Sequence, residues 1–191
     1  SGGHAHAVPL ALIITDVQEA SMCLTSVRAL NRIREKSSMN YSVRPATVSD
    51  VEKLVHFTIA DAVDAEGSEI GANVREGVLT ALEDNNYATY WVLEYGGLVI
   101  GNVSVVKEWS DWNAGYYWWI QSMFIEPAHR GKGLIRLLLE RVQREAANAN
   151  ALELRLYVHK DNSTAIGAYL KNGFGPSDYQ LMTMAVAEQA L

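Results

Sequence analysis

Cysteine is almost absent from this sequence of 191 residues, since Cys23 is the only one. No disulfide can close within the chain, which excludes a disulfide-stapled secreted scaffold and fits a reducing compartment. We therefore expect a cytoplasmic protein. Long apolar runs are also missing, because the longest, residues 7–14, is broken by Pro9 and is far too short to span a bilayer. No membrane partner is expected.

Positive charge is in deficit, with 16 Lys and Arg against 22 Asp and Glu and a formal net charge of −6. Such a chain is a poor nucleic-acid binder, because affinity for the phosphate backbone comes mainly from clustered Lys and Arg. Metal-ligand spacing is lacking as well: His4 and His6 could share a face, but no third ligand is in reach, and we expect no metal. A chain of this length with 49% hydrophobic residues is expected to be a soluble protein with one core.

Residues 1–38 are expected to form a mainly helical N-terminal extension. Apolar residues repeat with helical spacing over 16–36, which predicts one amphipathic helix there. An Arg-rich amphipathic N-terminus can also be an organelle-targeting leader, although Glu19 and Glu35 weaken that interpretation. The helix could be the mating surface of a homodimer, or it could pack on its own domain. Residues 39–191 are expected to form a single domain.

From Tyr41 onward the pattern alternates between strands and helices. The order of these elements predicts an α/β domain built on a mixed sheet. Gly96 and Gly97 predict a hairpin turn between two of the strands. The predicted strands are 41–44, 88–94, 98–106, 116–125, 152–158 and 179–186, and the predicted helices are 51–62, 70–83, 131–147 and 163–171.

A glycine-containing basic loop, residues 130–133, follows the apolar strand that ends before Pro127 and precedes a predicted helix. Glycines let the main chain approach a ligand closely, and the first N–H groups of a helix have no partner within it. The positive end of the helix dipole attracts phosphate. Arg130, Lys132 and Arg136 add positive charge, and residues 127–139 contain no acidic residue. The pattern indicates an anion site, although a basic surface turn before an ordinary helix has the same composition.

The segment from Met123 to Leu139 resembles the acetyl-CoA-binding motif of the Gcn5-related N-acetyltransferases, the GNAT superfamily. In that family the loop reads Arg/Gln-x-x-Gly-x-Gly/Ala, and its main-chain N–H groups hold the cofactor pyrophosphate. Arg130 and Gly133 match, whereas Ile135 stands where the final Gly or Ala is usual. A branched side chain at that position must point toward the sheet or displace the pyrophosphate slightly.

A second motif begins at Asn162 and ends at Gly173 and Phe174, and it is similar to the last helix of the same family. There an Asn lies beside the pantetheine arm and a Tyr, here Tyr169, protonates the departing sulfur. On residue type alone, Asn162 could simply cap its helix and Tyr169 could be a core residue. The resemblance spans about residues 41–186 and implies a GNAT-like mixed, mostly antiparallel sheet flanked by helices. It implies the following acetyl-CoA-binding residues: Met123, Phe124, Ile125, Arg130, Gly131, Lys132, Gly133, Leu134, Ile135, Asn162 and Tyr169.

The acceptor side is expected to be aromatic and acidic. Aromatic faces attract organic cations and carboxylates add Coulomb attraction, so Trp109, Asp111 and Trp112 are candidates for contact with an amine substrate. Trp118 and Trp119 continue the strand and are expected instead to cover the core. Residues 61–84 carry seven carboxylates against Arg75 alone, and in similar proteins this region roofs the acceptor: Asp61, Asp64, Glu66, Glu69, Glu76, Glu83 and Asp84.

The resemblance implies direct transfer of an acetyl group from acetyl-CoA to a primary amine, with a small cationic amine favoured. Main-chain N–H groups near 123–125 would hold the oxyanion, and Tyr169 would protonate the thiolate. Some family members carry a Glu where this chain has Gln121, which can orient water but cannot take a proton.

The group that removes the amine's proton is open. Glu126 is a candidate, together with Gln121 acting through water. Glu108 and Asp111 are further carboxylates nearby, and bulk solvent could also remove the proton before the amine binds. Two other functions also stay open: acetylation of a protein N-terminus or lysine, and a non-catalytic acyl-CoA-binding module. The departures at Gln121 and Ile135 motivate the second of these.

Overall fold

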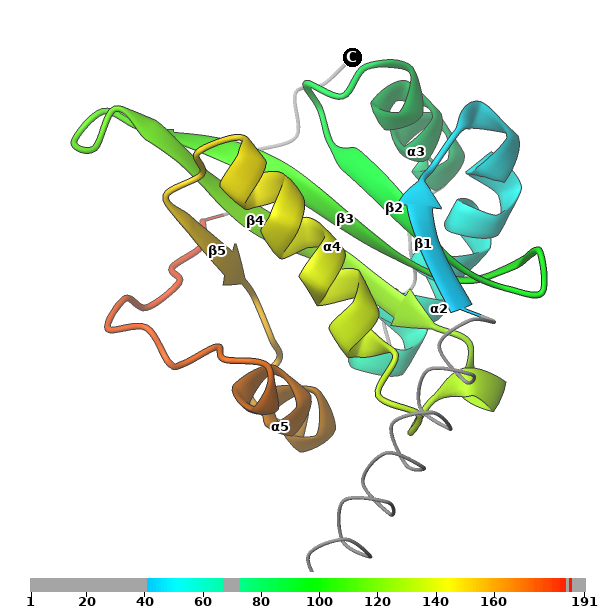
Figure 1. Ribbon diagram of the computed structural model, residues 1–191. Coiled ribbons are helices and arrows are strands. Elements are labelled where there is room, and N and C mark those ends of the chain that lie inside the picture. Colours follow the sequence, from blue (N-terminus) through cyan, green and yellow to red (C-terminus); the bar gives the residue numbers. More distant parts are fainter. Residues whose placement is uncertain (1–40, 67–72, 185, 187–191) are drawn as a thin grey trace, which may run out of the picture.

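A five-stranded sheet in the order β1-β2-β3-β4-β5 organises the molecule (Figure 1). The computed structural model describes residues 41–66, 73–184 and 186, so the helix expected over 16–36 lies outside the described residues. β1 to β4 pair antiparallel with their neighbours, and β5 pairs parallel with β4. The predicted mixed, mostly antiparallel sheet is therefore confirmed. The strands are β1 Tyr41–Pro45, β2 Thr89–Tyr95, β3 Leu98–Ser110, β4 Gly115–Ile125 and β5 Glu153–Leu156.

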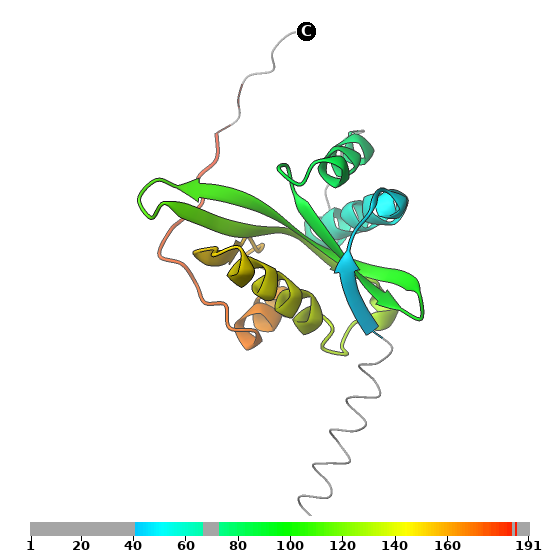
Figure 2. The ribbon, with the colours of Figure 1, turned by 45° about the horizontal axis from the view of Figure 1, so that its top comes forward.

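Helices cover both faces of the sheet. Figure 2 shows α4 on one face and the pair α2 and α3 on the other. In Figure 1, α5 lies beyond the C-terminal end of β5. Short 3-10 turns η1 Val48–Asp50 and η2 Pro127–His129 lead out of β1 and β4. None of the helices in the described ranges is long and apolar enough to cross a membrane. The α-helices are α2 Val51–Glu66, α3 Val74–Glu83, α4 Ile135–Asn148 and α5 Ser163–Lys171.

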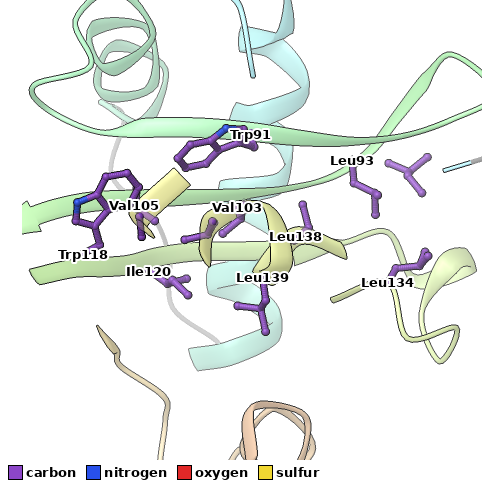
Figure 3. Packing of buried hydrophobic residues seen from close by; sticks show 12 residues of the cluster. Trp91, Leu93, Val103, Val105, Trp118, Ile120, Leu134, Leu138 and Leu139 are labelled. Atoms are coloured by element: carbon purple, nitrogen blue, oxygen red, sulfur yellow. The ribbon is translucent and has the colours of Figure 1, made fainter. Parts of the chain in front are cut away.

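The larger core lies between the sheet and α4 (Figure 3). Apolar residues three and four apart on α4 meet alternate residues of the strands, as the helical and extended periodicities require. Leu138 and Val142 are fully buried in this layer. Trp118 belongs to the same core and stacks against Trp91, so its predicted core position is confirmed. Other members are Leu93, Ile100, Val103, Val105, Ile120, Leu134, Leu139 and Ala146.

A second core fixes α2 and α3 on the opposite face, and its buried members are Val51, Leu54, Val78 and Val92. The Phe57 ring stacks on Phe124 of β4 with 5.1 Å between ring centroids. The start of the helix is held by Asp50, whose buried carboxylate accepts hydrogen bonds from the Arg44 guanidinium at 2.7 and 2.9 Å and from the main-chain N–H of Thr47 at 2.8 Å. These bonds hold the pKa of Asp50 below its usual value. β1 and β4 together therefore set where α2 lies.

Two sequence predictions need correction. The helix expected over 131–147 begins only at Ile135, because Gly131 and Gly133 adopt φ values of +74° and +72° that end helical geometry. The strand expected over 179–186 is wrong, since described residues 175–184 contain neither helix nor strand and Leu181 and Met184 are exposed. Alternating apolar residues favour a strand, but a strand forms only where a neighbouring edge pairs with it.

Gly101 on β3 provides a test of the contact between β3 and the end of β4. A Cβ built there would lie 2.6 Å from the Phe124 carbonyl oxygen and 3.3 Å from the Ile125 Cα. We expect Gly101→Ala to lower the free energy of unfolding by about 1–3 kcal/mol, because the main chain of β4 must move. Urea denaturation followed by circular dichroism measures the change.

Gly77 on α3 is the matched control, because a Cβ there meets nothing within 4 Å. Gly77→Ala should raise stability by about 0.5–1 kcal/mol through helix propensity and reduced freedom of the unfolded chain. Equal effects of the two substitutions would contradict the close approach at Gly101.

Candidate functional site

The turn from β4 into α4 presents a row of main-chain donors. After Arg130, whose N–H donates to the Pro127 carbonyl, the next main-chain N–H groups that bond within the turn and helix are those of Arg136, to the Gly133 carbonyl, and Leu137, to the Leu134 carbonyl. In the described part of the chain, no hydrogen bond engages the N–H groups of residues 131–135. Nothing lies within 4 Å of a Cβ built on Gly131 or Gly133, so the space beside the turn is open. Free donors at a helix start form an anion site.

Basic side chains surround this turn and help to fix its shape. The Arg130 guanidinium donates to the Ile125 carbonyl at 2.7 Å and lies 5.1 Å from the Phe124 ring centroid. The Lys132 ammonium donates to the Ala128 carbonyl at 3.2 Å. No acidic residue lies in the first turn of α4. The positive side chains therefore add to the partial positive charge at the N-terminal end of α4.

The side chains next to the turn point away from the open space. Leu134 is buried in the α4 core, and Ile135 packs against the same cluster from its edge. The branched side chain at 135 thus points toward the sheet, which is the first of the two arrangements expected from the sequence. Its main-chain N–H remains available to a ligand.

The pairing of β4 with β3 is interrupted at Gln121. Ser104 pairs with Ser122 and Val105 with Ile120, so Gln121 is the extra residue of a β-bulge. On the opposite edge, the parallel pairing with β5 ends at Ile120 and Leu156, and no described strand pairs with β4 beyond that point. The second half of β4, with Met123, Phe124 and Ile125, therefore borders a gap in the sheet that leads to the donor turn.

Tyr169 lies on α5, which begins after β5 has left β4. Its ring packs edge-on against Phe174 with 5.8 Å between centroids. Burial raises the pKa of the Tyr169 phenol above its usual value near 10, and the charge of Asp61 on α2 raises it further. The phenol is therefore protonated at neutral pH and can give a proton to a stronger base. Asp61 was only one of seven acidic residues in the sequence pattern.

Asn162 caps α5, as the residue type alone suggested. Its Oδ1 accepts the main-chain N–H of Ala165 at 3.0 Å. Gln121 is exposed at the bulge, whereas the Glu126 carboxylate forms an ion pair with Lys53 at 3.2 Å. Gln121 therefore lies beside the gap, whereas the carboxylate of Glu126 is engaged by Lys53.

The residues expected to hold the substrate do not join this site. Trp109, Asp111 and Trp112 lie at the tip of the hairpin between β3 and β4. Six residues of β4 separate the tip from Gln121, which corresponds to about 20 Å at the rise of an extended strand. Trp119 does not enter the core either, because it stacks on Tyr157 at 4.5 Å and its indole N–H donates to Glu108.

Potential metal ligands do not cluster in the described part of the chain. Among the residues that the structure describes, no group of three His, Cys, Asp or Glu side chains could hold a metal ion.

Comparison with solved structures identifies relatives of this arrangement. A possible acetyltransferase from Clostridium difficile 630 is 27% identical, with a TM-score of 0.72 over 78% of this chain and 99% of that one. A predicted acetyltransferase with acetyl-CoA from Clostridium acetobutylicum is 24% identical, with a TM-score of 0.63 over 75% and 96%. An aminoglycoside acetyltransferase from an uncultured soil metagenomic sample, in complex with sisomicin, shares the fold at 11% identity, with a TM-score of 0.66 over 79% and 99%.

The sequence itself carries the family assignment. No curated protein sequence matches the chain significantly. The model of the acetyltransferase (GNAT) family matches residues 59–174, which include the second half of α2, the sheet from β2 to β5, the donor turn and helices α3 to α5. The chain therefore belongs to the GNAT family of acetyltransferases.

Proposed function

We propose that the protein transfers an acetyl group from acetyl-CoA directly to the primary amine of a small cationic molecule. The observation that carries this proposal is the set of unengaged N–H groups at residues 131–135, placed where β4 ends and its pairing with β5 has stopped. A diphosphate on these donors would direct the rest of the coenzyme along the gap between β4 and β5. Family membership and a structural relative described with acetyl-CoA support the choice of coenzyme.

The residues of the gap would divide the chemistry between them. Main-chain N–H groups of the second half of β4, at 123–125, would stabilise the oxyanion as the amine attacks the thioester carbonyl. The carbon–sulfur bond then breaks, and Tyr169 would protonate the thiolate, since its raised pKa keeps the phenol protonated. Gln121, exposed at the bulge, would orient the water through which the amine loses its proton.

The acceptor is proposed to be a small amine because α2, the helix that carries Asp61, has more acidic than basic residues. Asp61 lies close enough to Tyr169 to affect its titration. Aminoglycoside acetyltransferases among the structural relatives show that the fold occurs in proteins named for polycationic substrates. In this proposal Glu126, paired with Lys53, maintains the position of α2, and the hairpin residues Trp109, Asp111 and Trp112 play no part in catalysis within one chain.

Coenzyme binding is tested at Gly133. The methyl group of Gly133→Ala would enter the open space beside the turn, and φ of +72° makes any side chain strained there by about 1–2 kcal/mol. We expect the Kd for CoA, measured by calorimetry, to rise about tenfold or more, which corresponds to about 1.4 kcal/mol.

Gly97, in the β2–β3 turn, is the matched control because its φ of +81° and open surroundings impose the same strain far from the turn. Gly97→Ala should destabilise the fold similarly and leave CoA affinity unchanged. Equal losses of affinity in both variants would show that strain alone, rather than the donor turn, is responsible.

Catalysis is tested at Tyr169. Tyr169→Phe removes the proton donor and should lower kcat by about 10²- to 10⁴-fold with little change in CoA affinity. A thiol-release assay with acetyl-CoA over a panel of polyamines, aminoglycosides, amino acids and peptides gives both the rate and the preferred acceptor. Tyr179→Phe, on an exposed side chain, is the control.

Three outcomes of this assay bear on the proposal. Unchanged turnover in Tyr169→Phe would remove the phenol from the mechanism. Tight CoA binding without thiol release for any amine would identify a binding module, and activity confined to peptides would identify a protein acetyltransferase.

A further inference from the structure

The segment that leads from β4 into the donor turn lies largely outside the core. From residue 127 to residue 133, every residue except His129 is exposed. The 3-10 turn η2 contains no buried residue, and the next buried residue along the chain is Leu134 in the α4 core. His129 is therefore the one partly buried residue of this stretch.

Two tyrosine rings from other strands cover His129. The centroid of its imidazole lies 5.3 Å from that of the Tyr95 ring at the end of β2, and 6.1 Å from that of the Tyr41 ring at the start of β1. The planes of His129 and Tyr41 meet at 86°, an edge-to-face arrangement that aromatic pairs favour. The Tyr41 hydroxyl also approaches the imidazole Nδ1 to 3.5 Å. The imidazole thus joins the donor turn to two strands that are distant in sequence.

The two tyrosines are a fixed support for the imidazole. Tyr41 and Tyr95 pair directly in the antiparallel register of β1 and β2, and their ring centroids are 4.6 Å apart. Tyr41 also packs against the α4 core. The Arg141 guanidinium of α4 donates to the Val43 carbonyl of β1 at 3.3 Å, which ties the strand to the helix a second time. The support is therefore attached to the same helix whose start follows the donor turn.

Other polar contacts of this segment act at its beginning or along its own main chain. The Arg130 guanidinium and the Lys132 ammonium donate to main-chain carbonyls five and four residues earlier, respectively. Glu126 pairs with Lys53 of α2 before the turn begins. The packing of His129 differs from these contacts, because it holds the middle of the segment against β1 and β2.

We propose that His129 is a positioning residue for the coenzyme, because its packing against Tyr41 and Tyr95 holds the N–H groups of residues 131–135 in place for the diphosphate. This inference rests on the coenzyme site of the proposed function. Donors that are ordered before an anion arrives bind it more tightly than donors that must be ordered on binding. Loss of the imidazole ring should therefore weaken coenzyme binding without slowing the chemical step.

The kinetic test compares His129→Ala with His129→Phe. His129→Ala should raise the Kd for CoA and the KM for acetyl-CoA about tenfold, while kcat at saturating acetyl-CoA stays within about threefold of the wild-type value. His129→Phe keeps a ring beside the two tyrosines and should bring both constants back to within about threefold of the wild-type values. A kcat that falls as much as KM rises, or equal losses in the two variants, overturns the proposal.

Tyr116→Ala is the matched control for the kinetic test. It removes an exposed ring that packs against Trp109 with 5.0 Å between centroids, at the opposite end of β4. The Kd for CoA and the KM for acetyl-CoA should stay unchanged in this variant. A tenfold rise in Tyr116→Ala as well would show that the loss of any ring pair has this effect, and would refute the specific role of His129.

A second measurement reports on the turn without any ligand. The ¹H–¹⁵N heteronuclear NOE of the Gly131 and Gly133 amides measures motion on the ps–ns timescale. It should fall in His129→Ala and recover in His129→Phe, whereas the NOE of Gly167 on α5 should stay the same in all three proteins. If the wild-type protein binds no CoA but this change occurs, the proposed function fails and the positioning of the turn by His129 stands. A turn that is equally rigid in the wild-type protein and in His129→Ala refutes the positioning role, whatever the CoA affinity.

Discussion

The path of the chain from β4 into α4 is the constraint on which the site depends. β4 ends at Ile125, and two glycines in the left-handed region delay the helix until Ile135. The orientation of the first turn is fixed by Leu134, which is buried in the α4 core, and by Ile135, which packs against its edge. The free N–H groups face outward as a direct result of this packing. Hydrophobic burial on one side of the turn therefore fixes a polar site on the other.

Much of this arrangement could be predicted from local patterns. Alternating apolar residues located the five observed strands, and the paired glycines at 96–97 located a hairpin turn whose residues have positive φ. The helix from Ser163 to Lys171 begins and ends as predicted, because Asn162 caps it and Gly173, with φ of +92°, follows its end. The glycine-containing basic loop was recognisable from its composition, because the positive φ values at Gly131 and Gly133 are the reason that glycine is found there.

Features that depend on tertiary placement were not accessible in this way. A single extra residue at Gln121 leaves no mark in the hydrophobic pattern, yet it changes which side chains face each layer. The turn with Trp109 and Trp112 has the composition of a cation site, but the length of the hairpin carries it away from the donor turn. Asp61 and Tyr169 are far apart in sequence, and only the tertiary placement of α2 and α5 brings them close enough for the charge of Asp61 to raise the pKa of Tyr169.

The open flank of the sheet bears on how the protein behaves in concentrated solution. β5 has only four residues, and no described strand covers its outer edge. After α5 the chain continues through Tyr179, Leu181 and Met182, whose side chains are 62–87% exposed. A short edge strand offers few main-chain groups for pairing with a strand of another molecule. Exposed apolar side chains in the segment after α5, by contrast, favour self-association. We therefore expect self-association at high concentration to begin at the exposed apolar residues of this C-terminal segment.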